Sequence, residues 1–370
     1  MLQSMSTPVS AQHIGFEATR LLRERRGIGR YVRNMLRWIP VHRPDVRFTL
    51  FVKRPTDIAP MREQLAGIDP SLPGRTTIEP VKALRDTDCD VVWYPWNWLF
   101  PPTRRTAMVA TINDVAPMLQ FDHRWWKVLK RRKARGRLLD TIRQADLIIT
   151  ISQFTSLEIQ RLLHADPSRI RVTLLATDDM TASASAESEA LARLGVQGPF
   201  FLTVGAHDAR KNLVTLYRAM ELMHAAGERV PLVQCGPSDE HEPYPFIKYA
   251  GYVSDAELAT LYRLATALVF PSRYEGFGLP VAEAMSAGGR VVCADASSLP
   301  EVVGNAGLLF PWHDAEALAA QLTRLLHDEA LRDQLTRDGL VQSRKFRWTD
   351  TAQQTLAVFD EAIARHGAQR

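Results

Sequence analysis

Residues 270–285, with the sequence FPSRYEGFGLPVAEAM, limit the fold of this chain more than any other stretch. They follow an apolar run, residues 266–270, which predicts a buried strand. Turn-forming residues come next, and a helical pattern opens at Pro280, a residue type favoured in a first helical turn. The stretch is therefore predicted to be a strand, a glycine loop and the start of a helix.

The start of this helix has the features of an anion-binding site. The backbone N–H groups of Phe277, Gly278 and Leu279 would have no partner inside the helix. They would also lie at the positive end of its dipole, where a phosphate is stabilised. Gly276 and Gly278 lack a side chain and allow a ligand to approach the backbone closely.

Two glutamates flank this loop, Glu275 on the loop and Glu283 eight residues later in the helix. Carboxylates beside a phosphate are better suited to accept hydrogen bonds from hydroxyl groups, such as those of sugar and ribose rings, than to touch the phosphate. The alternative is a strand-to-helix turn with merely solvated glutamates.

Length and composition place the chain among globular proteins of two domains. It has 370 residues, 46% of them hydrophobic and 24% charged. Its three cysteines lie in or beside apolar runs, which predicts reduced core thiols and a reducing compartment. The amino terminus lacks an apolar signal core, and no run approaches the length of a membrane span, so a soluble or peripheral protein is expected.

Charge is divided unevenly along the chain. Residues 1–180 hold 29 lysines and arginines against 18 acids, a net charge of +11, whereas the remainder holds 17 against 23, a net charge of −6. A basic first domain that meets an anionic partner is therefore expected.

Strand-like runs alternate with helical segments in both halves of the chain, which predicts parallel sheets with crossover helices. The predicted strands are residues 13–17, 48–52, 91–94, 108–112, 147–151 and 171–174, then 200–204, 231–236, 247–253, 266–270 and 307–310. Asn113 follows one of them at its carboxyl end, where open α/β sheets bind ligands. Asp86, Asp88 and Asp90 are expected to solvate a turn, and no metal site is predicted.

Gly27, Gly29 and Arg30 precede a helical pattern that is expected to stop at Pro40. A bound polar ligand and a plain tight turn both fit this Gly-x-Gly sequence. The third glycine of a dinucleotide fingerprint is replaced by Val32, which disfavours a dehydrogenase.

Residues 123–143 hold nine basic residues and one acid. Such a helix could bind an anionic membrane surface or a lipid-linked diphosphate acceptor, or it could be a surface helix whose apolar side packs on its own domain. No nucleic-acid-reading module is found. The residues proposed for membrane or acceptor binding are Trp125, Trp126, Lys130, Arg131, Arg132 and Lys133.

Arg210 and Lys211 lie between the strand 200–204 and the helix that begins at Leu213. A diphosphate at this position would meet two cations.

Several of these segments together resemble one family. Glu275 and Glu283, with Gly-Phe-Gly-Leu-Pro between them, resemble the Glu-x7-Glu signature of the family 4 (group 1) retaining glycosyltransferases, and residues 205–212 resemble that family's Gly-x4-Arg-Lys-Asn segment. The resemblance covers about residues 13–366. It implies the GT-B fold, in which two Rossmann-like domains face each other across a cleft and a C-terminal helix crosses back to the first domain.

The implied domains are an N-terminal tail at 1–12, an acceptor domain at 13–176, a linker with a short helix at 177–197, a nucleotide-sugar-binding domain at 198–345 and the crossover helix and tail at 346–370. The implied catalytic residues are Glu275, Arg210, Lys211 and Asn113. The implied donor-binding residues are Glu283, Gly276, Phe277, Gly278, Leu279, Gly205 and Val253, with Gly27, Gly29 and Arg30 bordering the donor phosphates or the acceptor.

Two positions depart from the family pattern. Many members have a histidine at the position of Asn113, and an amide cannot carry a proton as imidazole can. The usual Cys-Gly-Thr-Pro after the second glutamate is replaced here by residues 287–290, Ala-Gly-Gly-Arg.

The resemblance predicts a retaining, metal-independent hexosyltransferase without a cofactor. It would move a mannosyl-like or glucosyl-like group from a UDP or GDP sugar to a glycan or a polyprenyl-diphosphate-linked acceptor in cell-surface polysaccharide assembly. The enzyme would be cytoplasmic, either free or peripheral on the cytoplasmic face of a membrane. A GT-B phosphorylase, a nucleotide-sugar epimerase and a non-catalytic nucleotide-sugar-binding protein are the alternatives.

Overall fold

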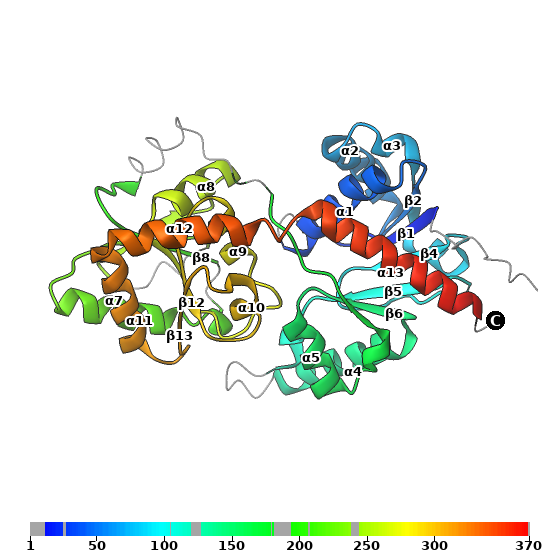
Figure 1. The fold of residues 1–370 in the computed structure, drawn as a ribbon. Coiled ribbons are helices and arrows are strands. Elements are labelled where there is room, and N and C mark those ends of the chain that lie inside the picture. Colours follow the sequence, from blue (N-terminus) through cyan, green and yellow to red (C-terminus); the bar gives the residue numbers. More distant parts are fainter. Residues whose placement is uncertain are drawn as a thin grey trace, which may run out of the picture. The chain divides into compact units, whose positions relative to one another are not determined.

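The computed structural model describes residues 12–24, 27–103, 105–119, 127–178, 180, 194–205, 208–237 and 244–368. These residues form two compact units, each built on its own parallel sheet (Figure 1). The first unit comprises the described residues up to Leu175 together with those from Trp348 onward, and the second comprises those of Ala176–Arg347. The predicted α/β architecture with two parallel sheets is confirmed.

The first unit contains a seven-stranded sheet in the order β3-β2-β1-β4-β5-β6-β7. All neighbouring strands run parallel. The sequence analysis missed β3, an edge strand with the polar sequence TTIEP in which only Ile78 is buried. The strands are β1 (His13–Glu17), β2 (Arg47–Val52), β3 (Thr76–Pro80), β4 (Val91–Tyr94), β5 (Ala107–Ile112), β6 (Leu147–Thr150) and β7 (Ile170–Val172).

Helices surround this sheet, and the last helix of the chain is one of them. α13 packs on α1 and β5, as the C-terminal crossover predicted from the resemblance requires (Figure 1). Arg43 holds α13 through two hydrogen bonds to Asp360, at 2.9 and 2.8 Å. The helices are α1 (Ile28–His42), α2 (Ile58–Ile68), α3 (Leu72–Arg75), α4 (Lys127–Gln144), α5 (Gln153–Leu163) and α13 (Trp348–Ala368).

The prediction that α1 stops at Pro40 was wrong, because the helix continues to His42. A proline inside a helix lacks an N–H donor and crowds the carbonyl four residues back, but residues beyond it can still bond backwards. The N–H of Arg43 donates to the carbonyl of Ile39 at 3.0 Å, so the last turn closes around the proline.

The second unit contains a six-stranded parallel sheet in the order β10-β9-β8-β11-β12-β13. Its strands are β8 (Phe201–Val204), β9 (Leu232–Cys235), β10 (Ile247–Gly251), β11 (Ala267–Phe270), β12 (Val291–Ala294) and β13 (Leu308–Phe310). Its helices are α7 (Leu213–Ala225), α8 (Asp255–Leu264), α9 (Leu279–Ser286), α10 (Leu299–Val303), α11 (Ala315–His327) and α12 (Glu329–Ser343).

In both sheets the strand order reverses between two central strands, β1 and β4 in the first and β8 and β11 in the second. Open α/β sheets bind ligands outside the carboxyl ends of their strands at such a reversal. We call residues 17–20 and 95–100 the first switch point, and residues 205, 208–212 and 271–279 the second switch point. Ligand binding is therefore expected at these two places.

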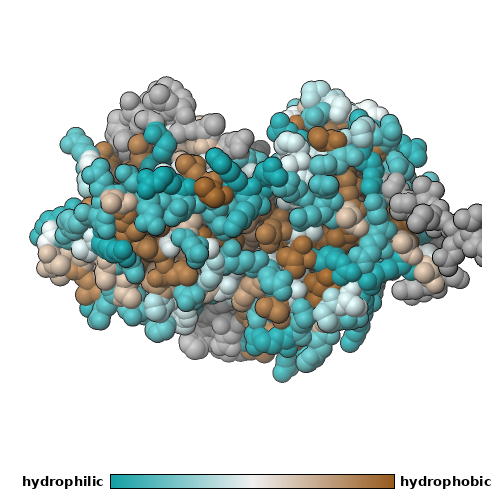
Figure 2. All heavy atoms as spheres, viewed as in Figure 1, coloured by the Kyte–Doolittle hydropathy of each residue, from teal (hydrophilic) through white to brown (hydrophobic). Residues whose placement is uncertain are grey.

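The core of each unit is apolar. Phe16, Tyr31 and Trp93 pack edge to face in the first unit, with Phe16 and Tyr31 both against Trp93. The three cysteines are buried and free, as predicted, and burial raises the pKa of the Cys89 thiol to about 11. In the view of Figure 2, hydrophilic side chains cover much of the outer surface of the helices. Among the described residues, no helix has both the length and the apolar character that crossing a membrane requires.

Candidate functional site

The loop after β11 forms the start of α9 as the sequence predicted. Gly278 precedes the first helical residue with φ 106°, a left-handed conformation that favours glycine. A Cβ atom on Gly278 would lie 2.8 Å from Leu299 Cδ2, so the position also leaves no room for a side chain. Within the described part of the chain, the N–H groups of Phe277, Gly278 and Leu279 donate to no protein acceptor, and no side chain caps the helix.

Two serines hold this loop in shape. The Ser298 hydroxyl donates to the carbonyl of Phe277 at 2.7 Å and to that of Glu275 at 3.0 Å. The Ser297 hydroxyl accepts from the N–H of Glu275 at 3.0 Å. These hydrogen bonds with Ser297 and Ser298 fix the backbone of the loop. Its free N–H groups therefore belong to a loop that is formed before any ligand binds.

Glu275 is the centre of a cluster that joins the two loops of the second switch point. Its Oε1 accepts from Lys211 Nζ at 2.7 Å and from the Ser272 hydroxyl at 2.6 Å. Its Oε2 accepts from Arg210 Nη1 at 3.2 Å. The sequence analysis predicted Glu275, Arg210 and Lys211 and gave no role to Ser272, although it lies in the same stretch as Glu275.

The cluster determines the charge of Glu275. Burial by itself would raise the pKa of this carboxyl group. The Lys211 ammonium, the Arg210 guanidinium and the hydrogen bonds from Lys211 and Ser272 outweigh burial and hold the pKa below its usual value. Glu275 is therefore a buried carboxylate that stays ionised at neutral pH.

The loop after β8 supports the two cations. Gly205 has φ 137°, a conformation that favours glycine. Its carbonyl oxygen lies so close to Gly236, just after β9, that a Cβ on Gly236 would be only 2.6 Å from it. The Lys211 ammonium lies 4.8 Å from the centre of the Phe270 ring. The carbonyl of Arg210 accepts from the N–H of Arg273 at 2.8 Å, which ties this loop to the one after β11.

The other residues predicted to bind the donor lie in the same unit. Glu283 is buried in α9, and its Oε2 accepts from the hydroxyl of Tyr262 in α8 at 3.2 Å. Val253 is buried just beyond β10, the edge strand of the sheet. Glu283 thus borders the loop of the second switch point, whereas Val253 follows a strand three places from β11.

Arg290, which departs from the family pattern, has a structural role. Its guanidinium donates to the carbonyls of Thr266 at 3.1 Å and Arg263 at 3.3 Å, and also to that of Ala265. Gly289 lies against the carbonyl of Tyr262, where a Cβ would overlap it. The substituted loop therefore closes the end of α8.

Asn113 lies in the first unit and is buried. Its Nδ2 donates to the carbonyl of Pro95 at 2.8 Å and to Asn97 Oδ1 at 3.0 Å, and its N–H donates to the same Oδ1 at 2.7 Å. Both donors of the side-chain amide are therefore used to shape the loop after β4.

The two glycines of the Gly-x-Gly segment have different surroundings, since a Cβ on Gly27 would meet nothing within 4 Å whereas Gly29 lies against Glu24. Gly27 has φ 54° and precedes α1, and a Cβ on Gly29 would overlap the carbonyl oxygen of Glu24. Arg30 lies in the first turn of α1, and its carbonyl accepts from Asn34 Nδ2 at 3.1 Å. The contacts of Gly29 favour the tight-turn interpretation at that position.

The basic helix α4 has two faces. Ala134 and Leu138 are buried, whereas Leu129 is 75% exposed. Of the predicted basic residues, Lys130, Arg132 and Lys133 are exposed and Arg131 is partly buried, while Trp125 and Trp126 lie outside the described residues. The packed face and the basic face both exist, so packing of the helix does not compete with binding to an anionic surface.

Asp86, Asp88 and Asp90 were predicted to solvate a turn and not to bind a metal. Asp90 Oδ2 accepts from the N–H groups of Gln12 and His13, each at 2.8 Å, and so fixes the start of β1. In the described parts of the chain, no three His, Cys, Asp or Glu side chains gather as metal ligands would.

The fold and the second switch point define a class of protein with two Rossmann-like units and, in the second, a glycine loop beside two cations. Comparison with known proteins identifies the family. The model of the glycosyl transferases group 1 matches residues 189–340. O-antigen chain mannosyltransferase B of Escherichia coli is 34% identical over 294 residues, which are 75% of this chain and 76% of that protein. The chain therefore belongs to the group 1 glycosyltransferases.

Other relatives agree with this assignment. The serotype-specific mannosyltransferase WbdA of Escherichia coli is 28% identical over 273 residues, and the match spans 69% of this chain but only 33% of WbdA. Among solved structures, sucrose-phosphate synthase of Thermosynechococcus elongatus has a TM-score of 0.74 at 20% identity, covering 95% of this chain and 99% of that one. HepE of Anabaena, in complex with UDP and glucose, has a TM-score of 0.68 at 16% identity, covering 93% and 98%. These structures confirm the GT-B fold.

Proposed function

We propose that this glycosyltransferase moves a mannosyl group from a nucleoside-diphosphate sugar, with UDP or GDP as carrier, to a growing glycan. The transfer retains the anomeric configuration and needs no metal ion. The observation that carries the proposal is the convergence of Glu275, Lys211 and Arg210 beside the free N–H groups at the start of α9.

The diphosphate would bind the N–H groups of Phe277, Gly278 and Leu279 together with the two cations. Negative charge on the diphosphate grows as its bond to the sugar breaks, so these donors stabilise the transition state more than the ground state. They replace the charge that a metal ion would supply. Glu275 would accept hydroxyls of the donor sugar, and Glu283 those of the ribose.

Retention is inferred from the resemblance to the family 4 retaining glycosyltransferases, and the surroundings of Glu275 bear on the route that it would take. A carboxylate that already accepts from Lys211, Arg210 and Ser272 is a poor nucleophile, which disfavours a covalent glycosyl-enzyme intermediate at this residue. The acceptor would instead attack from the side of the leaving group, and the departing phosphate would take its proton.

The sugar and the acceptor are inferred from the relatives. The first two named above are mannosyltransferases, one of them of the O-antigen chain. A polysaccharide-building enzyme on the cytoplasmic face of a membrane, with a glycan or a polyprenyl-diphosphate-linked glycan as acceptor, fits these names. The first unit would receive that acceptor.

The test is a thermal-shift panel of nucleoside diphosphates and nucleotide sugars, followed by NMR of the products. A ligand at 100 times its dissociation constant should add about 2.7 kcal/mol of stability. We expect stabilisation by UDP or GDP sugars and an α-linked product from the α-linked donor. A sugar phosphate or an epimerised donor as product would instead show a phosphorylase or an epimerase, and stabilisation without turnover would show a binding protein.

Membrane association is tested separately by flotation with vesicles containing anionic lipid. Neutralising Lys130, Arg131, Arg132 and Lys133 should abolish flotation, because exposed basic residues bind such surfaces at roughly 1 kcal/mol each. The matched control neutralises four exposed basic residues of the second unit, Lys248, Arg337, Arg344 and Lys345. Equal flotation of both variants would reject α4 as the contact.

A further inference from the structure

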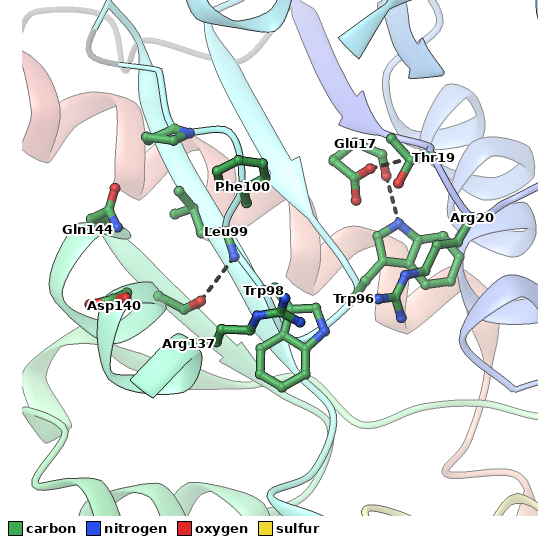
Figure 3. Close-up of a pocket in the computed structure, with 12 residues that line it drawn as sticks. Glu17, Thr19, Arg20, Trp96, Trp98, Leu99, Phe100, Arg137, Asp140 and Gln144 are labelled. Carbon is green, nitrogen blue, oxygen red and sulfur yellow. Dashed lines mark hydrogen bonds between the residues drawn. The ribbon is translucent and has the colours of Figure 1, made fainter. Parts of the chain in front are cut away.

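The first switch point holds a cavity to whose residues the function proposed above assigns no role. Its volume is about 600 Å³, within the range of small-molecule sites, and it lies wholly in the first unit (Figure 3). It is lined by the end of β1 and the residues after it, by residues after β4 and by one side of α4: Glu17, Thr19, Arg20, Trp96, Trp98, Leu99, Phe100, Pro102, Arg137, Asp140, Thr141 and Gln144.

Two indole rings form the apolar part of the wall. Trp96 is buried, and its Nε1 donates to the carbonyl of Glu17 at 2.8 Å, so the ring is fixed in place. Trp98 is partly exposed, and the guanidinium of Arg137 lies 5.8 Å from its ring centre. The N–H of Leu99 donates to Thr141 Oγ1 at 3.0 Å and ties this loop to α4 (Figure 3).

The polar part of the wall is balanced in charge. Arg20 and Arg137 supply two guanidinium groups, and Glu17 and Asp140 supply two carboxyl groups. Glu17 is only 5% exposed, and its Oε1 accepts from the N–H of Thr19 at 3.0 Å. Burial raises the pKa of this carboxyl group, a shift that hydrogen bonds from Thr19 and the charge of Arg20 reduce but do not reverse.

We propose that this cavity binds pyranose rings of a neutral glycan and that this glycan is the acceptor of the transfer. Aromatic faces pack against the C–H faces of sugar rings, while carboxyl and guanidinium groups exchange hydrogen bonds with ring hydroxyls. A phosphate would be met by as many acids as cations, and a lipid chain would remove the charged side chains of the wall from water. The assignment rests on the glycosyl transfer proposed above.

Isothermal titration with α-linked mannotrioses, with maltotriose as a second probe, tests the assignment without a donor present. Trp98→Ala should weaken binding of the trisaccharide by about tenfold, as loss of a central aromatic contact does. Trp98→Phe, which keeps an aromatic face, should restore most of it. The matched control is Trp38→Ala, which removes a partly buried tryptophan of the same unit that lies outside the cavity.

Binding of the nucleotide sugar distinguishes a failure of the cavity assignment from a failure of the proposed function on which it rests. Trp98→Ala should keep wild-type binding of the nucleotide sugar while its KM for the glycan rises. Unchanged glycan affinity in Trp98→Ala, with donor binding intact, would overturn the assignment of the cavity. Failure of the wild-type protein to bind any nucleotide sugar would instead overturn the proposed function.

Discussion

The two switch points have the same place in their sheets but opposite chemistry. The second presents backbone N–H groups and two cations around one carboxylate. The first presents two indole rings and equal numbers of acids and cations. The same fold therefore offers one site that suits a dianionic diphosphate and one that suits a neutral polyol.

The buried carboxyl groups show how the surroundings create this difference. Glu17 is the last residue of the central strand β1, Glu275 lies in the loop after the central strand β11, and both are buried. Two cations lower the pKa of Glu275, although burial opposes them. Burial is the dominant cause at Glu17, whose pKa is raised. One carboxyl group is thus part of a charged cluster, and the other is part of a nearly neutral wall.

The largest effect is expected from Lys211→Ala. Losing one donor that stabilises a leaving group costs roughly 100-fold to 1,000-fold in kcat. We therefore expect kcat for glycosyl transfer to fall by about that factor, measured with saturating donor. Lys248→Ala, which removes an exposed lysine on β10 of the same unit, is the control.

Glycan binding at the first switch point provides a second readout for the Lys211→Ala variant. Lys211→Ala should leave the affinity for a mannotriose unchanged when no donor is present. Wild-type kcat in Lys211→Ala would show that the Lys211 ammonium does not stabilise the leaving diphosphate.

Gly278→Ala tests the backbone of the loop after β11. The substitution forces a side chain into a left-handed conformation and against Leu299, which should lower the free energy of unfolding by about 2–3 kcal/mol. Urea denaturation measures the loss. Gly67→Ala in α2, where a Cβ meets nothing within 4 Å, should instead stabilise slightly, by about 0.5–1 kcal/mol. Equal effects of the two substitutions would show that the loop after β11 is not constrained.

Asn113→His introduces the residue that many family members have. Histidine cannot reproduce both hydrogen bonds of the amide to Pro95 and Asn97, so a loss of about 1–3 kcal/mol in unfolding free energy is expected. Denaturation together with a transfer assay measures it. A variant that is as stable as the wild type and more active would show that position 113 acts in catalysis rather than in holding the loop.

The smallest effect is a difference between two pH profiles of stability. The lowered pKa of Glu275 stabilises the fold above 4.5, the reference value for an unfolded glutamate, and this contribution is lost as pH falls through the folded pKa below it. The raised pKa of Glu17 works in reverse, because stability falls as pH rises from 4.5 through the folded pKa.

Glu275→Gln should therefore destabilise the protein at pH 7 and matter less in acid. Glu17→Gln should have little effect below pH 4.5 and stabilise the protein above the folded pKa, since the glutamine oxygen can still accept from Thr19. Urea titrations from pH 3 to pH 8 compare the two. Profiles of the same sign would contradict the contrast between the two carboxyl groups.

The sequence predicted the second switch point because its parts lie in contiguous motifs. Residues 270–285 contain a strand, a loop and a helix start, and the adjacent pair Arg210 and Lys211 follows another strand. The sequence assigned no role to Ser272, Ser297 and Ser298, whose hydroxyls hold the loop, because a serine in a motif does not indicate which group it bonds. Alternating apolar runs likewise predicted the sheets but missed the polar edge strand β3.

The first switch point could not be predicted in the same way. Trp96 and Trp98 lie on a loop without a motif, and Arg137 and Asp140 come from a helix about 40 residues further along the chain. Only the tertiary structure brings these groups to one cavity. The sequence instead indicated Asn113. Its side-chain amide donates hydrogen bonds to Pro95 and Asn97 in the loop after β4.

The most direct test of the account is a crystal structure of the protein with a bound nucleoside-diphosphate mannose. The account predicts diphosphate oxygens within hydrogen-bond distance of the N–H groups of Gly278 and Leu279 and of the Lys211 ammonium. A diphosphate bound among Trp96, Trp98 and Arg137 instead, or anywhere apart from the start of α9, would contradict it.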